Sequence, residues 1–169
     1  MIKLVRLDER LIHGQAAARL LKSMDVDTAV VVDDESANSK IATQALLMAV
    51  IGAGLSGRIK TSVKTADVGI RMLNDPRCEP KKIIIVVRDI NILYRIANEV
   101  SGIQEINIGN YGGIVESDEP RKMIARGFSV NDSEAKIFKE IAKSGKRVYF
   151  QPTPDSELID TEELLKKLD

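Results

Sequence analysis

The residues best suited to chemistry in this sequence lie close together near its beginning, in the stretch RLDERLIHGQ. It contains His13, the only histidine among 169 residues, preceded by Arg6, Asp8, Glu9 and Arg10. Guanidinium groups bind phosphate oxygens through paired hydrogen bonds, and an imidazole can accept a phosphoryl group and give it away again. These residue types in this order therefore predict phosphoryl transfer through His13.

A helix is predicted to begin directly after the histidine, over residues 14–22, where the sequence becomes rich in alanine and leucine. The first N–H groups of a helix lack partners within the helix and carry a partial positive charge, so they stabilise an anion on the imidazole. We expect the backbone N–H groups of Gly14 and Gln15 to hold the phosphoryl oxygens. The alternative is a surface or half-buried histidine that only caps this helix.

The charged residues before the histidine have expected roles of their own. Arg6 and Arg10 would contact the phosphate or the acidic surface of a partner protein, because both lie within one loop length of His13. Asp8 would fix an arginine or the imidazole ring. We expect no metal here, because the chain has a single histidine and no cluster of acids at ligand spacing.

Short β-rich runs alternate with helical patterns along the whole chain, and no repeat or long linker interrupts them. This alternation predicts an α/β fold in a single domain, with a mostly parallel central sheet of about seven strands and helices on both faces. The predicted strands are residues 2–7, 28–34, 58–63, 82–87, 105–109, 122–130 and 146–151. The predicted helices are residues 14–22, 39–50, 65–73, 90–100, 132–143 and a last one after Asp160.

Ligands of parallel sheets bind beyond the carboxyl ends of the strands. This rule selects the segments 6–13, 33–34, 62–65, 88–89 and 110–113, which should lie on one rim of the sheet. Ser62 and Asn110 are therefore further candidates for phosphate binding. The glycine-rich run GNYGG after the fifth strand has two open interpretations: a turn, or a backbone that must approach a ligand closely.

Composition excludes several classes of function. The 25 basic and 25 acidic residues cancel, which argues against a nucleic-acid or membrane-surface binder. Cys78 is the only cysteine, and the first residues are too highly charged for a signal peptide. The longest apolar run, residues 45–55, contains two glycines and is too short to span a bilayer. We therefore expect a cytoplasmic protein.

Two other motifs suggest chemistry less strongly. GAGLSG, residues 52–57, matches a dinucleotide-binding pattern, but it follows a predicted helix and precedes a predicted strand, the reverse of the required order. A helix C-cap explains these glycines better. Asp33 and Asp34 follow the second strand and could mark a metal site or a receiver-type acidic pair, but helix-capping or hydrogen-bonding loop acids are the simpler interpretation.

The stretch VRLDERLIHGQ, residues 5–15, closely resembles the active-site signature of enzyme IIB of the mannose/fructose/sorbose family of the bacterial sugar phosphotransferase system (PTS). The pattern of that family is Arg, an apolar residue, Asp, Asp or Glu, Arg, Leu, an aliphatic residue, His, Gly and Gln, and every position matches. The resemblance extends along the chain through VVVDDESAN, KTSVKTA, INIGNYGG and GFSVNDSEAKIFKEIAKSGKRVYFQPTP.

The resemblance implies a function. His13 would be phosphorylated on Nδ1 by the phosphohistidine of a partner IIA protein and would pass the group to a sugar brought by the membrane components IIC and IID. The chain would be a protein-N(pi)-phosphohistidine–sugar phosphotransferase without a cofactor. Residues 1–169 would form one free-standing IIB domain, recruited to the inner face of the membrane by IIC and IID.

Two alternatives remain open at this stage. The first is a regulatory module of the same fold that takes phosphate and reports it without sugar transfer. The second is a nucleotide-binding enzyme that uses the glycine-rich loops.

Overall fold

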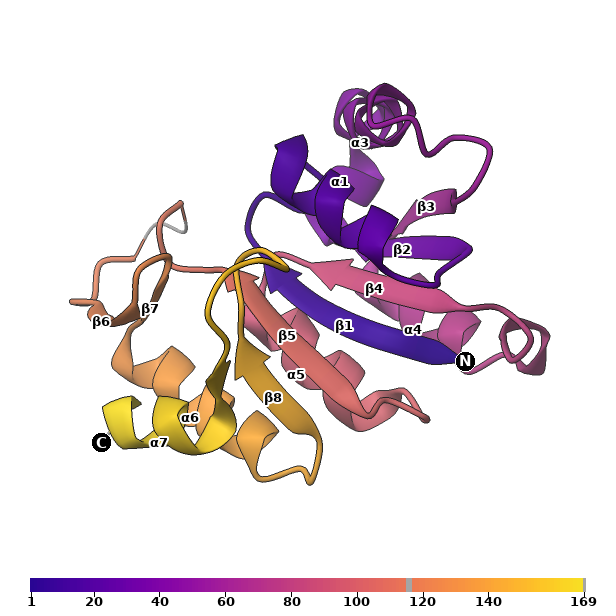
Figure 1. Ribbon diagram of the computed structural model, residues 1–169. Coiled ribbons are helices and arrows are strands. Elements are labelled where there is room, and N and C mark those ends of the chain that lie inside the picture. The colour runs from indigo at the N-terminus through magenta and orange to yellow at the C-terminus, as the bar shows by residue number, and fades with distance from the viewer. Residues whose placement is uncertain (115–116, 169) are drawn as a thin grey trace.

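A seven-stranded sheet forms the centre of the protein in a computed structural model, which describes residues 1–114 and 117–168 (Figure 1). The strand order is β3-β2-β4-β1-β5-β8-β9; every neighbouring pair is parallel except β8 and β9. The strands of this sheet are β1 (Ile2–Asp8), β2 (Thr28–Val32), β3 (Lys60–Lys64), β4 (Ile83–Val87), β5 (Glu105–Asn110), β8 (Arg147–Phe150) and β9 (Ile159–Asp160).

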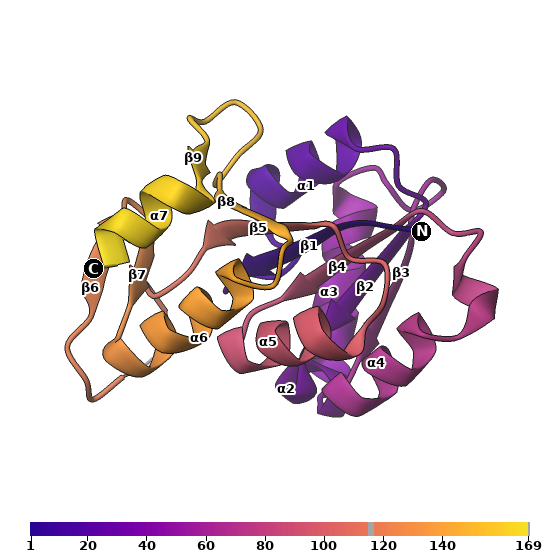
Figure 2. The same cartoon turned by 90° about the horizontal axis from the view of Figure 1, so that it is seen from below.

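Helices cover both faces of this sheet, and each face has its own core (Figure 2). One face packs against α1 (Gly14–Ser23) and α3 (Lys40–Gly52), and the other against α4 (Ala66–Leu73), α5 (Ile90–Glu99), α6 (Asp132–Ala142) and α7 (Thr161–Leu168). Strand β4 is buried along its whole length, as its unbroken apolar run predicts for a central parallel strand. The predicted α/β class with about seven mostly parallel strands is confirmed.

The sheet changes winding direction between β1 and β4. The chain leaves β1 through α1 on one face, whereas it leaves the adjacent β4 through α5 on the other face. The loops at the carboxyl ends of these two strands therefore diverge and leave a crevice, which is where ligands bind in sheets of this kind. Residues 9–13 follow β1 at this crevice, and Arg88 follows β4.

The segment 122–130 differs from the prediction of one strand in the central sheet. It forms a hairpin of β6 (Lys122–Ala125) and β7 (Phe128–Val130), which make a separate two-stranded sheet. Gly127, with φ 91°, takes the left-handed conformation in the turn between them. The seventh strand of the central sheet is instead the two-residue β9. Two short helical segments also went unpredicted, α2 (Asp34–Asn38) and the 3-10 turn η1 (Pro76–Cys78).

Polar side chains cap several helix starts. Asn131 and Glu134 form a capping box at the start of α6, each side chain bonded to the other's backbone N–H. Asp160 accepts a hydrogen bond from the N–H of Glu163 at the start of α7. Thr65 stands at the N-cap position of α4, but its side chain makes no capping bond.

The glycines of GAGLSG end a helix, as predicted. Gly54 has φ 72° just after the C-terminus of α3, and its N–H donates to the carbonyl of Ile51. The next N–H, of Leu55, donates to Val50, which completes a Schellman motif. A strand, β3, follows this loop, so the order of elements is the opposite of that in a dinucleotide-binding site.

Candidate functional site

His13 stands at the junction between the β1 loop and helix α1. It is the N-cap residue, with extended backbone angles of φ −134° and ψ 134°, and its side chain makes no capping hydrogen bond. The residue is exposed, and the first turn of α1 contains no acidic side chain. Gly14, with φ 69°, and Gln15 open the helix, and both are also exposed. The histidine thus faces solvent beside a helix start that no side chain of the helix neutralises.

A groove of about 510 Å³ runs past this histidine at the crevice between β1 and β4. Its polar walls include Glu9, Arg10, His13 and Arg88. The remaining lining residues are Leu11, Gly14, Ser36, Ala42, Ala45, Leu46 and Ile114. The groove is therefore charged along the β1 loop and apolar along α3.

Arg10 is exposed and brings a positive charge to this groove. Within the described part of the chain, its guanidinium has no hydrogen bond or ion pair, and its backbone N–H donates to Asp8 over 3.1 Å. Arg10 and His13, both predicted site residues, line the same groove. A guanidinium with all its donors available suits an incoming phosphate.

Arg6 occupies a different environment, buried at the base of the same loop with 3% of its surface exposed. Its Nη2 lies 2.7 Å from Asp8 Oδ2 and 2.8 Å from the carbonyl oxygen of Pro152, and its Nη1 donates to Asn107. Gly109 packs directly against this guanidinium, where any side chain would overlap it. Arg6 therefore joins β1, β5 and the segment after β8 beneath the loop.

Asp8 connects this buried base with the exposed part of the loop. One carboxylate oxygen binds Arg6 and the other accepts the N–H of Arg10, while the Asp8 carbonyl accepts the N–H of Leu11. Leu11 has φ 54°, the only left-handed angle of a non-glycine residue in the described chain. Asp8 thus binds the guanidinium of Arg6 and the backbone of Arg10, and the loop that carries His13 is bent around its carboxylate.

The other side of the loop is tied to the GNYGG segment through Glu9, which is 6% exposed. Its Oε2 accepts the N–H groups of Gly113 and Ile114, each over 3.0 Å, and the side-chain amide of Asn110 over 3.5 Å. Asn110 is thus near the site, but its side chain binds Glu9. The glycine-rich segment serves here as a hydrogen-bonded wall of the groove.

Behind this wall, Tyr111 is held in a buried polar cluster. Its hydroxyl donates to Glu134, which also pairs with Arg121 over 2.7 Å. Burial, together with the nearby negative charge of Glu134, raises the pKa of Tyr111 well above its usual value. The cluster therefore keeps the tyrosine protonated and anchors the GNYGG segment to the first turn of α6.

Residues of two predicted rim segments, 33–34 and 62–65, have other roles. Ser62 lies within β3, paired with Val30, because the strand continues to Lys64. Strands β2 and β4 stand between it and β1, and it does not line the groove. Asp33 caps α2, and Asp34 accepts the N–H of Ala66 over 2.7 Å, so both act as hydrogen-bonding loop acids.

Arg88 is the functional candidate that the sequence left unassigned, although its position on the rim was predicted. It lines the groove, and its Nη2 lies 3.0 Å from Asp33 Oδ2 and 2.8 Å from Ser36 Oγ. Its Nε is buried and has no hydrogen-bond partner among the described residues. The signal that identifies it is its place directly after a buried central strand next to β1.

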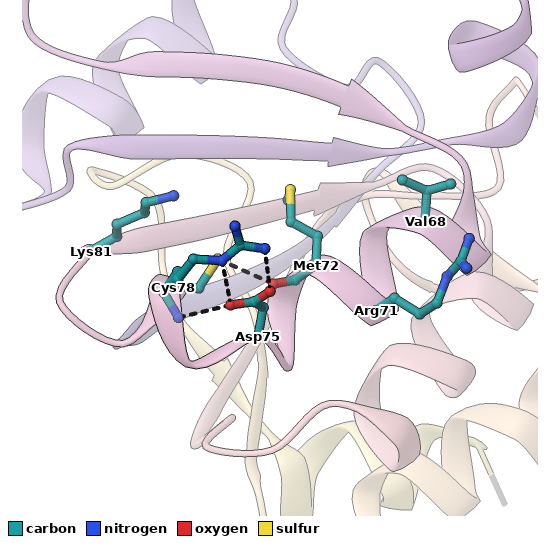
Figure 3. Close-up of a pocket in the computed structure, with 7 residues that line it drawn as sticks. Val68, Arg71, Met72, Asp75, Cys78 and Lys81 are labelled. Atoms are coloured by element: carbon teal, nitrogen blue, oxygen red, sulfur yellow. Dashed lines mark hydrogen bonds and ion pairs between the residues drawn. The ribbon is translucent and has the colours of Figure 1, made fainter.

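A second hollow, of about 450 Å³, lies at the opposite, amino edge of the sheet (Figure 3). Asp75 at its centre binds Arg77, while Cys78 is buried and its Sγ contacts the carbonyl of Met72. None of the predicted site residues lines this hollow.

Within residues 1–114 and 117–168, no group of three or more His, Cys, Asp or Glu side chains is placed to hold a metal ion. In the same part of the chain, none of the helices combines the length and apolar character that a bilayer crossing requires.

Comparison with known proteins identifies the class to which this fold and groove belong. Residues 2–169 match the family described as PTS system sorbose subfamily IIB component. The chain belongs to this family, the sugar-specific IIB components of the phosphotransferase system, and it is therefore a transferase of PTS sugar transport. The family resemblance predicted from residues 5–15 is confirmed.

Individual relatives and solved structures agree with this assignment. A probable phosphotransferase enzyme IIB component of Streptococcus pyogenes is 29% identical over 162 residues, which cover 88% of this chain and 96% of that protein. The mannose-specific EIIAB component of Escherichia coli is 24% identical over the whole chain, which spans 50% of that longer protein. The crystal structure of manxB from Thermoanaerobacter tengcongensis superposes with a TM-score of 0.84 at 27% identity, covering 99% of this chain and 96% of that one. The IIBSor domain of the Klebsiella pneumoniae sorbose permease, at 18% identity and a TM-score of 0.84, covers 99% of this chain and 95% of that one and shares the fold.

Proposed function

We propose that this protein is a phosphoryl carrier and that His13 is the residue that carries the phosphoryl group. The observation that supports it most directly is the meeting of three features in one groove: the only histidine of the sequence, a helix start without a side-chain cap, and Arg10, whose guanidinium has no partner among the described residues. Helix N-termini and guanidinium groups both stabilise a group with nearly two negative charges.

The proposed donor is the phosphohistidine of a partner IIA protein. An imidazole nitrogen of His13, Nδ1 in our proposal, attacks phosphorus, the bond from phosphorus to the donor nitrogen breaks, and its electron pair returns to the donor imidazole. In the second transfer a sugar hydroxyl attacks the same phosphorus. The bond from phosphorus to the His13 nitrogen breaks and its electron pair returns to the imidazole, while the proton of the hydroxyl ends on that imidazole and restores neutral histidine. Phosphohistidine is already an activated donor, so these steps need neither nucleotide nor cofactor.

The proposed roles of the surrounding residues follow from their positions. Arg10 contacts the phosphoryl group, and the backbone N–H groups of Gly14 and Gln15 hold its oxygens at the start of α1. Arg6 and Asp8 act beneath the loop and hold Arg10 and His13 in place.

The family assignment supports a set of partners. We propose that the sugar reaches His13 through membrane components IIC and IID, and that these recruit the protein to the cytoplasmic face of the membrane. The relative from Escherichia coli described as an EIIAB component combines the names IIA and IIB in one protein, which is consistent with a IIA donor.

The test of this function is stepwise reconstitution. The protein is incubated with phosphoenolpyruvate, enzyme I, the phosphocarrier protein and a cognate IIA, and its intact mass is measured. We expect one acid-labile, hydroxylamine-sensitive phosphate on the native chain and none on His13→Ala. A stable phosphate on serine would contradict the proposal. Membranes containing IIC and IID are then added with sugar, and retention of the phosphate would favour the regulatory module over the carrier.

A further inference from the structure

We propose that Glu9 is a positioning residue that holds the 110–114 segment against the groove and thereby protects the phosphohistidine from water. This inference rests on the proposed role of His13. Glu9 is adjacent to Arg10 in the chain and lines the same groove as His13, yet its carboxylate points into the GNYGG segment.

The contact is a carboxylate seated on consecutive backbone N–H groups. Oε2 of Glu9 accepts from Gly113 and Ile114, each over 3.0 Å, and the backbone N–H of Glu9 donates to the carbonyl of Asn110 over 2.9 Å. Successive N–H groups turned toward one point form an anion-binding concavity. Glu9 supplies the anion from within the chain, and the amides disperse its charge so that it repels an incoming phosphate less.

The segment is fixed independently on its far side. Gly112, with φ 89°, packs so closely on Ser129 and Arg121 that a side chain there would overlap both. The Gly112 carbonyl accepts the hydroxyl of Ser129 over 2.9 Å. Removal of the Glu9 carboxylate would therefore free residues 113–114 on the groove side while residues 111–112 stay attached to the hairpin.

The hydrogen bonds from Gly113 and Ile114 to Glu9, called the Glu9 latch below, have a functional consequence because of where Ile114 lies. Its side chain lines the groove, although 63% of it is exposed, and the apolar residues Ala42, Ala45 and Leu46 of α3 line the same groove. Apolar walls on a reaction site exclude water from reactive intermediates. In hydrolysis, a water oxygen bonds to phosphorus while the phosphorus–nitrogen bond to His13 breaks, which wastes the phosphoryl group. When its hydrogen bond to Glu9 holds Ile114 at the groove, the side chain would exclude water and slow this hydrolysis.

The experiment measures the lifetime of the phosphorylated protein after the donor is removed, by intact mass over time. The variants are Glu9→Ala, Glu9→Gln and Ile114→Ala. Glutamine keeps an oxygen that can accept both N–H groups, whereas alanine does not. Glu157→Ala is the matched control for the acid, because Glu157 is exposed and lies outside the groove. Met123→Ala is the control for Ile114, because Met123 is 74% exposed and also lies outside the groove.

We expect Glu9→Ala to shorten the lifetime by about tenfold or more, the factor that corresponds to loss of hydrogen bonds to a charged acceptor. Glu9→Gln should remain within about threefold of the native lifetime on the same grounds. Ile114→Ala should shorten the lifetime without changing the melting temperature, and both controls should match the native protein.

Native lifetimes in both Glu9→Ala and Ile114→Ala would overturn the proposal, as would a Glu9→Gln lifetime as short as that of alanine. Should Glu9→Ala fail to fold, Ile114→Ala decides alone. If the native protein accepts no phosphate, the proposed function fails. The latch is then tested by amide hydrogen exchange at Gly113 and Ile114, which should accelerate in Glu9→Ala and not in Glu9→Gln.

Discussion

Arg6 lies in β1 and Arg10 lies four residues later in the loop that follows, and their surroundings are opposite. Arg6 is 3% exposed and satisfied by Asp8, Asn107 and the carbonyl of Pro152, whereas Arg10 is exposed with a guanidinium that has no partner among the described residues. A buried charge with full hydrogen bonding holds elements together, and an unpaired charge at a groove is available to a ligand. Arg6 therefore stabilises the base of the loop, whereas Arg10 is available to bind a ligand at its tip.

The largest expected effect is on stability, from Arg6→Ala. Removal of one partner of a buried ion pair leaves Asp8 uncompensated and lowers the free energy of unfolding by about 3–5 kcal/mol. For a chain of this size the melting temperature should fall by roughly 10 °C. Thermal and urea unfolding measure both quantities. An Arg6→Ala protein with native stability and slow phosphoryl transfer would place Arg6 among the phosphate-contacting residues and break the comparison.

Arg10→Ala, in contrast to Arg6→Ala, should slow phosphoryl transfer and leave the stability nearly unchanged. Loss of one contact to a transferring phosphoryl group costs on the order of 10² to 10³ in rate. The melting temperature should change by only about 2 °C or less, as for most exposed substitutions. Single-turnover transfer from phosphorylated IIA at saturating donor measures the rate.

Arg126→Ala is the matched control for Arg10, because Arg126 is exposed in the β6–β7 turn and does not line the groove. If Arg10→Ala transfers at the native rate once the donor saturates, Arg10 serves docking alone. Its effect would then depend on salt concentration.

Gly109 and Gly113 allow a second comparison between the buried surroundings of Arg6 and the exposed groove. Gly109→Ala should lower the free energy of unfolding by about 1–3 kcal/mol, because the added methyl overlaps the buried Arg6 guanidinium. Gly113→Ala should be nearly neutral, since a methyl there lies 3.9 Å from Glu9 Oε2. Urea unfolding of both variants is the measurement, and equal losses would contradict this account.

The smallest effect concerns alkaline pH and Tyr111. Burial raises the pKa of Tyr111 in the folded state above its value in the unfolded chain. The unfolded chain therefore releases this proton first, and the stability that the tyrosine contributes is lost as the pH rises above about 10. The loss is at most about 1.4 kcal/mol per pH unit. Tyr111→Phe should flatten the curve of unfolding free energy between pH 9 and 11, and an unchanged slope would show that other groups cause it.

Much of the fold could be predicted because its signals are local. The buried run of β4 and the capping pair Asn131 and Glu134 are recognisable within a few residues. The segment 122–130 was harder, because its two short strands have the same composition as one longer strand and only the turn at Gly127 divides them. Strand β9 has two residues and exists because it pairs with β8, which no local pattern shows.

The site divides in the same way. The exposed tip, His13 and Arg10, could be predicted from spacing, because both lie in one short loop before a helix. The burial of Arg6 could not, since its partners Asn107 and Pro152 are more than a hundred residues away in the chain. The hydrogen bonds from residues 113–114 to Glu9 could not be predicted either, because they form only when β5 pairs with β1, which is distant in the chain.

The N-cap position of His13 also affects how its variants should be interpreted. The residue has the extended angles of an N-cap but no capping bond, and aspartate, asparagine and serine are the side chains that cap such a position best. Aspartate at this position would therefore stabilise α1 by about 1 kcal/mol relative to alanine. An aspartate introduced to imitate phosphohistidine would thus report a better-capped helix, and His13→Gln is the cleaner reference for the unphosphorylated carrier.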